Sequence, residues 1–288
     1  TVRRDGSSRF GRNNRWGTFP SVSLAWRASE EEWFPKNNIL NDLKIRAGYG
    51  VTGSQASVGN YSYLASYNTS VYPFGKTGTE QSALISATLA NPNIHWEQVA
   101  QTNIGFDAAL FNQRARLTFD YYIKNTTDML VKASIPITSG FEDTSTTYTN
   151  AGKVRNSGFE VQVGHNNRIG DWTYNVGANF SRVSTKILYL KGGDTPGQSV
   201  GDPLWAYYGY VCDGIFKDEA DVKNHVHQAT GVPKPGDLKY RDLDKSGSVD
   251  SRDRKVLGSY FPKINFGLNF SVQYKDFEIG RASCRERV

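Results

Sequence analysis

Apolar and polar residues alternate one by one along seven segments of this chain, and that pattern constrains the fold more than any other. In residues 265–274, Phe266, Leu268 and Phe270 alternate with polar or glycine positions. Successive side chains of a β-strand point to opposite sides of a sheet, so each segment predicts a strand with one apolar and one polar face. The segments are residues 22–26, 43–50, 103–110, 115–122, 159–163, 172–181 and 265–274.

The lengths of the segments and of their connections favour a membrane barrel. Several segments run about ten residues, roughly twice the usual length of a globular strand and enough to cross a bilayer. Short connections at 111–114 and 166–171 alternate with long ones at 51–99, 125–156 and 183–263. No run of about 20 apolar residues is present, so no transmembrane helix is predicted. We therefore expect an all-β fold, an antiparallel transmembrane β-barrel with long extracellular loops.

The composition of the two faces agrees with this fold. The polar face is rich in Gly, Asn, Ser and Thr, which suits a water-filled lumen. Aromatic residues recur near strand ends, where the interface girdles of a barrel lie. They are Trp26, Tyr49, Tyr121, Trp172 and Tyr274. The alternative is a soluble or surface carbohydrate-binding β-domain with a calcium-stabilised loop. Such a domain would stay monodisperse without detergent, whereas a barrel fragment exposes strand edges and a lipid face.

The net charge of +6 does not indicate a nucleic-acid partner. Five arginines against one aspartate in residues 1–15, and three arginines against one glutamate in residues 281–288, account for the whole excess. A nucleic-acid-binding domain would spread a basic surface through the fold. Cys212 and Cys284 lie far apart in the sequence, so a disulfide framework is not predicted either.

The segment 242–253 resembles a calcium loop of the EF-hand type. Oxygen-bearing side chains stand at positions 1, 3, 5, 7, 9 and 12, with Gly247 at the sixth position where the turn is tight. These candidate metal ligands are Asp242, Asp244, Ser246, Ser248, Asp250 and Asp253. The common loop ends in Glu, and the shorter Asp253 reaches a bidentate position less easily. The other interpretation is a polar turn whose Asp and Ser side chains bond to their own backbone.

Enzyme activity is not expected. The chain has four histidines and no G-x-S-x-G motif, so it lacks the signature of a nucleophile with its base. His225 and His227 form an H-x-H pair without a third ligand. The aromatic residues Trp205, Tyr207 and Tyr208 are expected to pack the loops, to meet a partner protein or to stack on sugar rings.

Seven motifs occur in a fixed order between residues 5 and 278. They are DGSSRFGRNNRWGTFPSVSLAWRASEE (Asp5–Glu31), LKIRAGYGVTGSQ (Leu43–Gln55), NPNIHWEQVAQTNIGFDAALFNQR (Asn91–Arg114), DYYIKNTTDML (Asp120–Leu130), NAGKVRNSGFEV (Asn150–Val161), YYGYVCDGIF (Tyr207–Phe216) and PGDLKYRDLDKSGSVDSRDRKVLGS (Pro235–Ser259). In this order they resemble the C-terminal barrel of the SusC/RagA family of TonB-linked outer-membrane transporters.

The resemblance implies a barrel of about 22 strands, of which this chain holds about eight to ten. It also implies a plug domain that this chain lacks, a SusD-like lipoprotein as partner, and energy delivered by the TonB complex through the plug. The implied cargo is an oligosaccharide or a peptide, and the location is the outer membrane of a Gram-negative bacterium. The lumen wall would include Lys44, Arg46, Asp107, Arg116, Asp120, Glu160 and Gln162.

The last residues depart from the pattern. Residues 280–288 show no alternation and no terminal aromatic residue. We therefore expect residues 1–279 to form a partial barrel and residues 280–288 to be a non-native tail.

Overall fold

A computed structural model describes residues 1–35, 37–74, 78–141, 146–191, 197–229 and 231–287. The chain forms two compact units. Unit 1 comprises Thr1–Ser184, Leu188–Gly192 and Lys263–Val288. Unit 2 comprises Thr185–Ile187 and Gly193–Pro262. Among the residues that the structure describes, no helix is long and apolar enough to cross a membrane.

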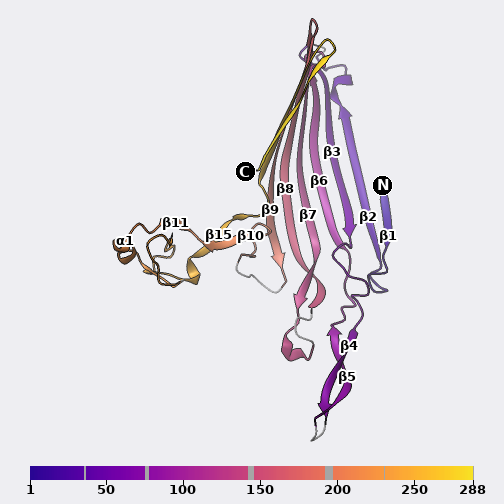
Figure 1. Cartoon of the computed structure of the whole chain (residues 1–288). Coiled ribbons are helices and arrows are strands. Elements are labelled where there is room, and N and C mark those ends of the chain that lie inside the picture. The colour runs from indigo at the N-terminus through magenta and orange to yellow at the C-terminus, as the bar shows by residue number, and fades with distance from the viewer. Residues whose placement is uncertain (36, 75–77, 142–145, 192–196, 230, 288) are drawn as a thin grey trace. The chain divides into compact units, whose positions relative to one another are not determined.

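Unit 1 is built around a sheet of nine strands in the order β1-β2-β3-β6-β7-β8-β9-β16-β17 (Figure 1). The strands are β1 (Val2–Gly6), β2 (Trp16–Arg27), β3 (Leu40–Ser54), β6 (Glu97–Leu110), β7 (Ala115–Ser134), β8 (Thr146–Ile169), β9 (Trp172–Leu190), β16 (Ile264–Tyr274) and β17 (Phe277–Arg287). Neighbouring strands of this sheet follow one another along the chain, apart from the strands of the insertions after β3 and β9, so the sheet is an up-and-down meander. It does not close, because β1 and β17 lie at its two edges.

All seven predicted strands are present, and the sheet adds β1 and β17 to them. The predicted turn at 111–114 is also confirmed: Phe111, Asn112 and Gln113 all have positive φ, between 55° and 66°. The strand count lies within the predicted range of about eight to ten. The fold class is therefore the predicted one, a partial antiparallel barrel.

The connections at 125–156 and 183–263 are shorter in the structure than the sequence predicted. Pairing of β7 with β8 continues to Ser134 and Thr146, so much of the expected connection 125–156 is strand. β9 likewise continues to Leu190. In these stretches apolar and polar residues do not alternate strictly. The strands can still pair there, because the backbone hydrogen bonds that hold two strands together do not depend on side-chain polarity. A register shift between Thr126 and Met129 marks where the pairing becomes irregular.

The connection 51–99 contains a separate hairpin. It consists of β4 (Ser66–Phe74) and β5 (Thr79–Thr88), which extend beyond the long-connection end of the sheet (Figure 1). Short 3-10 turns lie in two other connections, η1 (Ala28–Glu30) after β2 and η2 (Ile137–Ser139) after β7. The tight turns gather at the opposite end of the sheet, as predicted for a barrel.

A small apolar core lies at the long-connection end of the sheet. Its buried members are Phe10, Phe19, Val58, Ile94, Trp96 and Leu130. Trp96 packs against Phe10 at 5.0 Å and Phe19 at 5.5 Å between ring centroids. The core ties three connections to the strands, so the motifs that stand far apart in the sequence meet here.

Unit 2 is the long insertion between β9 and β16. It contains the pairs β10–β15, β11–β13 and β12–β14. Its elements are β10 (Ala206–Tyr210), β11 (Cys212–Ile215), α1 (Glu219–Asn224), β12 (His227–Gln228), β13 (Leu238–Tyr240), β14 (Ser248–Val249), η3 (Ser251–Asp253) and β15 (Arg254–Ser259). Phe216, Val249 and Asp253 are buried within it. The expected outer loop is thus a folded unit of its own.

Residues 280–287 continue β17 and pair with β16. The prediction that residues 280–288 are a non-native tail concerns the origin of the segment and not its conformation, and it stays a prediction.

Candidate functional site

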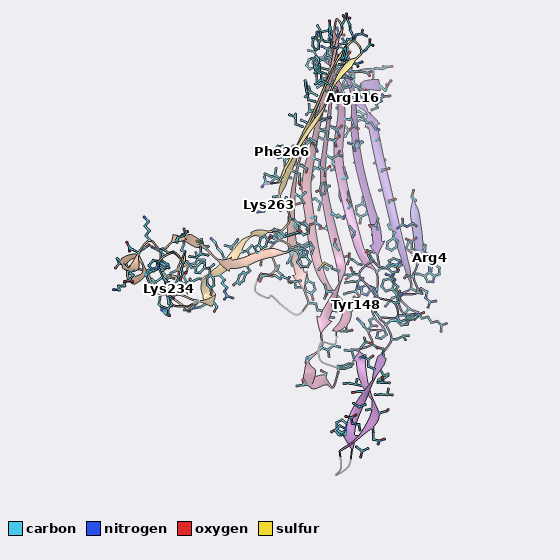
Figure 2. The ribbon with its side chains drawn as sticks, viewed as in Figure 1. Arg4, Arg116, Tyr148, Lys234, Lys263 and Phe266 are labelled. Atoms are coloured by element: carbon cyan, nitrogen blue, oxygen red, sulfur yellow. The ribbon has the colours of Figure 1, made fainter. Side chains whose placement is uncertain are left out.

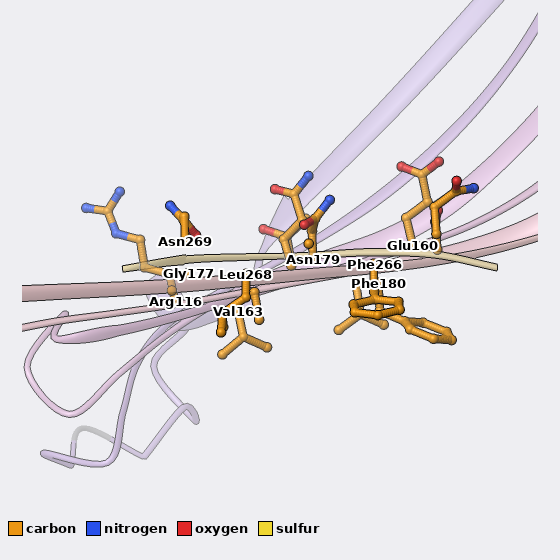
Figure 3. A pocket seen from close by; sticks show the side chains of 17 residues that line it. Arg116, Glu160, Val163, Gly177, Asn179, Phe180, Phe266, Leu268 and Asn269 are labelled. Carbon is orange, nitrogen blue, oxygen red and sulfur yellow. The ribbon is translucent and has the colours of Figure 1, made fainter. Parts of the chain in front are cut away.

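The sheet of unit 1 has one polar and one apolar face, and these faces are the candidate functional surfaces. Figure 2 shows its side chains, among them Arg116 and Phe266. In Figure 3, Arg116, Glu160, Asn179 and Asn269 project from one side of the strands. Phe180, Phe266, Leu268 and Val163 project from the other. The alternation read from the sequence therefore separates the two kinds of side chain in space.

The predicted lumen residues lie together on the polar face. Cross-strand pairing places six of the seven in two adjacent rows. One row is Lys44, Asp107, Thr118 and Gln162 across β3, β6, β7 and β8. The next row is Arg46, Gly105, Asp120 and Glu160 across the same strands. The seventh residue, Arg116, follows on β7.

Arg46 holds a network of charges on this face. Its guanidinium donates to Asp107 at 2.8 and 3.2 Å and to Asp120 at 3.1 Å. Thr118 donates a further hydrogen bond to Asp107 at 3.1 Å. One guanidinium thus pairs with two carboxylates, and these side chains form hydrogen bonds with one another.

Gly105 makes this network possible, and it was missed in the sequence. It stands between Arg46 and Asp120 in the row, and a Cβ atom there would overlap the Asp120 carboxylate. The signal that could have revealed it is the register: Gly105 falls opposite Arg46 once the strands 43–50 and 103–110 are aligned.

A hollow of about 890 Å³ lies over β7, β8, β9 and β16. Five polar side chains of its lining differ from the Arg46 network because they make no hydrogen bond or ion pair within the described residues. These side chains are Arg116, Glu160, Gln162, Asn179 and Asn269. Asn179 and Asn269 each lie opposite a glycine of the neighbouring strand, Gly267 and Gly177, so their amides cross the neighbouring backbone. One cation, one anion and three neutral amides are thus available to bind a polar ligand.

The apolar face carries exposed large apolar side chains on every strand from β2 to β16 of the sheet. All five predicted girdle residues, Trp26, Tyr49, Tyr121, Trp172 and Tyr274, are exposed. A row of four phenylalanine rings also runs across four strands, with 5.6 to 6.4 Å between neighbouring ring centroids; its members are Phe106, Phe119, Phe159 and Phe180. A soluble domain rarely leaves so large an apolar surface uncovered. The face therefore favours contact with hydrocarbon and weighs against the soluble alternative.

The acidic loop of unit 2 brings three of its six predicted ligands together. Carboxylate oxygens of Asp242, Asp244 and Asp253 lie within 4.8 Å of one another. Gly247 has a φ of 88°, a conformation that favours glycine, so it occupies the tight turn as expected. The Asp250 carboxylate is instead bound by Arg252, with 2.8 Å between Nη2 and Oδ2. The Ser246 hydroxyl donates to the Ser248 carbonyl at 3.0 Å.

Asp253 is the most firmly held residue of this loop. Its side chain is fully buried and accepts backbone N–H bonds from Asp250 at 2.8 Å, from Leu243 at 2.7 Å and from Asp244 at 3.2 Å. These donors, that of Asp250 above all, hold the pKa of Asp253 below its ordinary value, although burial acts in the opposite direction. The donors also agree with the interpretation as a self-bonded polar turn.

The other candidate residues of unit 2 do not converge. His225 Nε2 lies 2.9 Å from the Tyr240 carbonyl oxygen, so this ring is engaged with backbone. Cys212 is an exposed thiol that is not in a disulfide. Trp205, Tyr207 and Tyr208 are all exposed within unit 2, and the choice among their three expected roles stays a prediction.

Comparison with known proteins agrees with this geometry. The sequence profile described as TonB dependent receptor-like, beta-barrel matches residues 1–277. The TonB-dependent receptor P3 of Formosa agariphila is 33% identical, covering 97% of this chain and 29% of that relative. The TonB-dependent receptor SusC of Bacteroides thetaiotaomicron is 31% identical, covering 100% of this chain and 29% of that relative.

Solved structures show the same relationship. A structure of the RagAB peptide transporter matches 100% of this chain and 30% of its own chain, with a TM-score of 0.80 at 26% identity. This chain therefore spans less than a third of the length of the relatives it matches. The sheet, its two faces and the matched profile together assign the chain to the TonB-dependent receptor β-barrel family, a family of SusC-like outer-membrane transporters and receptors and not of enzymes.

Proposed function

We propose that this chain forms part of the wall and outer loops of an active importer that carries oligosaccharides or peptides across the outer membrane. The importer would work with a SusD-like lipoprotein and draw its energy from the TonB complex. The observation that carries this proposal is the sidedness of the sheet: an exposed, predominantly apolar face and, behind it, a polar face with hydrogen-bonding groups that have no partner among the described residues.

The polar face supports passage of a polar cargo. Arg116 and Glu160 offer both signs of charge, and the amides of Gln162, Asn179 and Asn269 offer donors and acceptors. Hydroxyl groups of a sugar and amide groups of a peptide bind to the same set of partners. One solved structure of similar fold is that of a peptide transporter, and the same polar groups would also suit a sugar. Both cargo classes are therefore within the proposal.

Deletion and complementation in the source bacterium test this function. We expect that loss of the gene abolishes uptake of one class of labelled oligosaccharide or peptide, and that the intact gene restores it. Because the energy comes from the inner membrane, a protonophore should stop uptake by the complemented strain. Uptake that survives deletion for both cargo classes, or that ignores the protonophore, would contradict the proposal.

We further propose that the loop 242–253 binds Ca²⁺. The support is the spacing of its oxygen-bearing residues and the approach of the Asp242, Asp244 and Asp253 carboxylates to within 4.8 Å. A divalent cation prefers such hard oxygen ligands. Bound calcium would stiffen unit 2 and would take no part in catalysis.

Hydrogen exchange of the loop amides, measured in the full transporter with CaCl₂ or with EGTA, tests this site. Calcium should slow exchange in the native protein and in a control, Asp213→Asn, whose carboxylate pairs with Arg241 outside the loop. Asp242→Asn should abolish the response. An equal response in Asp242→Asn, or none in the native protein, would contradict calcium binding here.

A further inference from the structure

The charged side chains of the polar face differ in their pairing from one half of the sheet to the other. On β3, β6 and β7, Arg46 pairs with Asp107 and Asp120. In the hollow over β7, β8, β9 and β16, Arg116 and Glu160 have no such partner within the described residues. The hollow therefore holds one cation and one anion that are both available to a ligand.

Ring contacts on the apolar face align β8 with β9. Phe159 lies 5.8 Å from Phe180, and His165 lies 5.5 Å from Tyr174, between ring centroids. Both pairs give the same register, and opposed side chains of an antiparallel pair share a face, so the polar positions between them are aligned as well. Two polar rows result across β8, β9 and β16. They are Glu160, Asn179 and Gly267, and Gln162, Gly177 and Asn269.

The two charges lie at opposite ends of the hollow (Figure 3). Glu160 pairs with Asp120 of β7, and Arg116 stands four residues before Asp120 on the same strand. At about 3.4 Å per residue, the two positions are about 13 Å apart along the strands. Arg116 is the charge nearer the tight turn at 111–114.

Three amide side chains occupy the space between the two charges. Gln162, Asn179 and Asn269 line the hollow and offer N–H donors and carbonyl acceptors without charge. A Cβ atom at Gly177 or Gly267 would overlap one of the asparagine amides, so only glycine leaves them room. The order along the hollow is thus cation, neutral amides, anion.

The Glu160 end of the hollow favours a positively charged group for a second reason. Directly opposed side chains of an antiparallel pair have Cβ atoms about 4.5–5.5 Å apart, so the carboxylates of Glu160 and Asp120 lie close together. Arg46 pairs with Asp120 through Oδ2 only, and the buried Oδ1 has no hydrogen-bond partner among the described residues. An ammonium group beside Glu160 would reduce the repulsion between the two carboxylates.

A short peptide with free termini carries its groups in the matching order. Four extended residues span about 13–14 Å, with an ammonium at one end and a carboxylate at the other. Arginine binds a carboxylate through two parallel hydrogen bonds, and peptide groups donate to and accept from side-chain amides. A neutral oligosaccharide would use the amides and leave both Arg116 and Glu160 without a partner.

We propose that this hollow is a subsite for a peptide segment of about four residues, with its amino terminus at Glu160 and its carboxylate at Arg116. This inference rests on the import function proposed above and narrows its cargo to peptides. It also orients the cargo, because the carboxylate end would lie toward the tight turns of the sheet.

Binding of tetraalanine to the purified full transporter tests the subsite. An environment-sensitive fluorophore is attached to a cysteine that replaces Ser181, which lines the hollow, with native cysteines changed to serine. Tetraalanine is compared with its C-terminal amide, its N-acetyl form and maltotetraose. We expect a saturable change of fluorescence with tetraalanine, an affinity about three- to tenfold lower for each blocked peptide, and no saturable change with maltotetraose.

Variants of the two charged residues assign each terminus to its partner. Arg116→Gln should weaken tetraalanine binding by about three- to tenfold and leave binding of the C-terminal amide unchanged. Glu160→Gln should weaken tetraalanine binding to a similar degree and leave binding of the N-acetyl form unchanged. Lys44→Gln removes a charge from the same face outside the hollow, so this control should change none of the affinities.

A lack of any saturable response to tetraalanine would overturn the subsite. Binding of maltotetraose as tight as that of tetraalanine, or a preference for free termini that survives in both variants, would overturn it too. None of these results would affect the loss of uptake on gene deletion, which tests import itself. Uptake that survives deletion would instead contradict import and leave the measured binding intact, so the two failures are distinguishable.

Discussion

Arg46 of β3 reaches Asp120 of β7 across the whole width of the intervening strand β6, with 3.1 Å between Nη2 and Oδ2. The row position between them is Gly105, which has no side chain to block the guanidinium. Three strands are thereby joined by side chains as well as by backbone hydrogen bonds. Asp120 uses only Oδ2 in this contact, and its buried Oδ1 has no hydrogen-bond partner among the described residues.

Gly105→Ala should destabilise the barrel by about 1–3 kcal/mol, the usual range for an overpacked site. The new methyl group would overlap the Asp120 carboxylate and crowd the Phe119 carbonyl. The matched control is Gly164→Ala on β8, where a Cβ atom meets nothing within 4 Å and the change should stay within about 0.5 kcal/mol. Urea unfolding of the full transporter in vesicles measures both. Equal effects of the two variants would contradict the role of Gly105.

Arg46→Gln should destabilise more than the double variant Arg46→Gln/Asp120→Asn. The single change leaves Asp107 and Asp120 close together without their shared cation, and removing one partner of a half-buried pair costs more than removing both. The same unfolding measurement, completed with Asp120→Asn alone, gives the coupling between the two residues. Additive effects would show that the contact contributes nothing to stability.

Asn150→Ala should loosen the connection 91–96 at the long-connection end. The Asn150 side chain accepts from the His95 N–H at 3.1 Å and donates to the carbonyls of His95 at 2.9 Å and Asp128 at 2.8 Å. Loss of these bonds should cost about 1–3 kcal/mol. Limited proteolysis near residue 95 is the measurement. Asn150→Asp, which keeps only the acceptor, should be cleaved at an intermediate rate, and native-like resistance of both variants would count against this role.

Acid should loosen the loop 242–253 through Asp253. The folded-state pKa of this carboxyl is lowered, so its stabilising contribution is complete above the ordinary aspartate pKa of about 3.9 and is lost as pH falls through the lowered value. Hydrogen exchange in EGTA, corrected for intrinsic rates, should therefore show constant protection down to about pH 4 and falling protection below it. In Asp253→Asn the protection should be weaker at neutral pH and its loss in acid should be smaller, because only Asp250, whose pKa is also lowered, chiefly by Arg252, would then contribute. An unchanged pH profile in that variant would exclude Asp253 as the cause.

The strands of unit 1 were predictable because the signal that defines them is local. Phe266, Leu268 and Phe270 alternate with polar neighbours whatever the rest of the chain does, and the same holds for the six other predicted segments. The faces followed from this alternation, so the polar residues Arg46, Asp107 and Asp120 were assigned to one side correctly. Their contact was not predictable, because it depends on register and on Gly105.

Other features lie outside such a local pattern. The continuation of β7 and β8 to Ser134 and Thr146 depends on pairing between strands, and its sequence no longer alternates. The fold of unit 2 rests on buried residues such as Phe216 and Asp253, which come from irregular segments. In the acidic loop the spacing predicted six ligands, whereas the structure brings three carboxylates together and pairs Asp250 with Arg252.

We expect one face of the sheet to meet lipid and the other to line a water-filled lumen. Single cysteines along β16 of the full transporter, treated in outer-membrane vesicles with a small membrane-impermeant thiol reagent, test it most directly. Cysteines at Asn269 and Ser271 should react, whereas those at Leu268 and Phe270 should not. Equal reactivity at all four positions would contradict the claim and would favour a soluble β-domain.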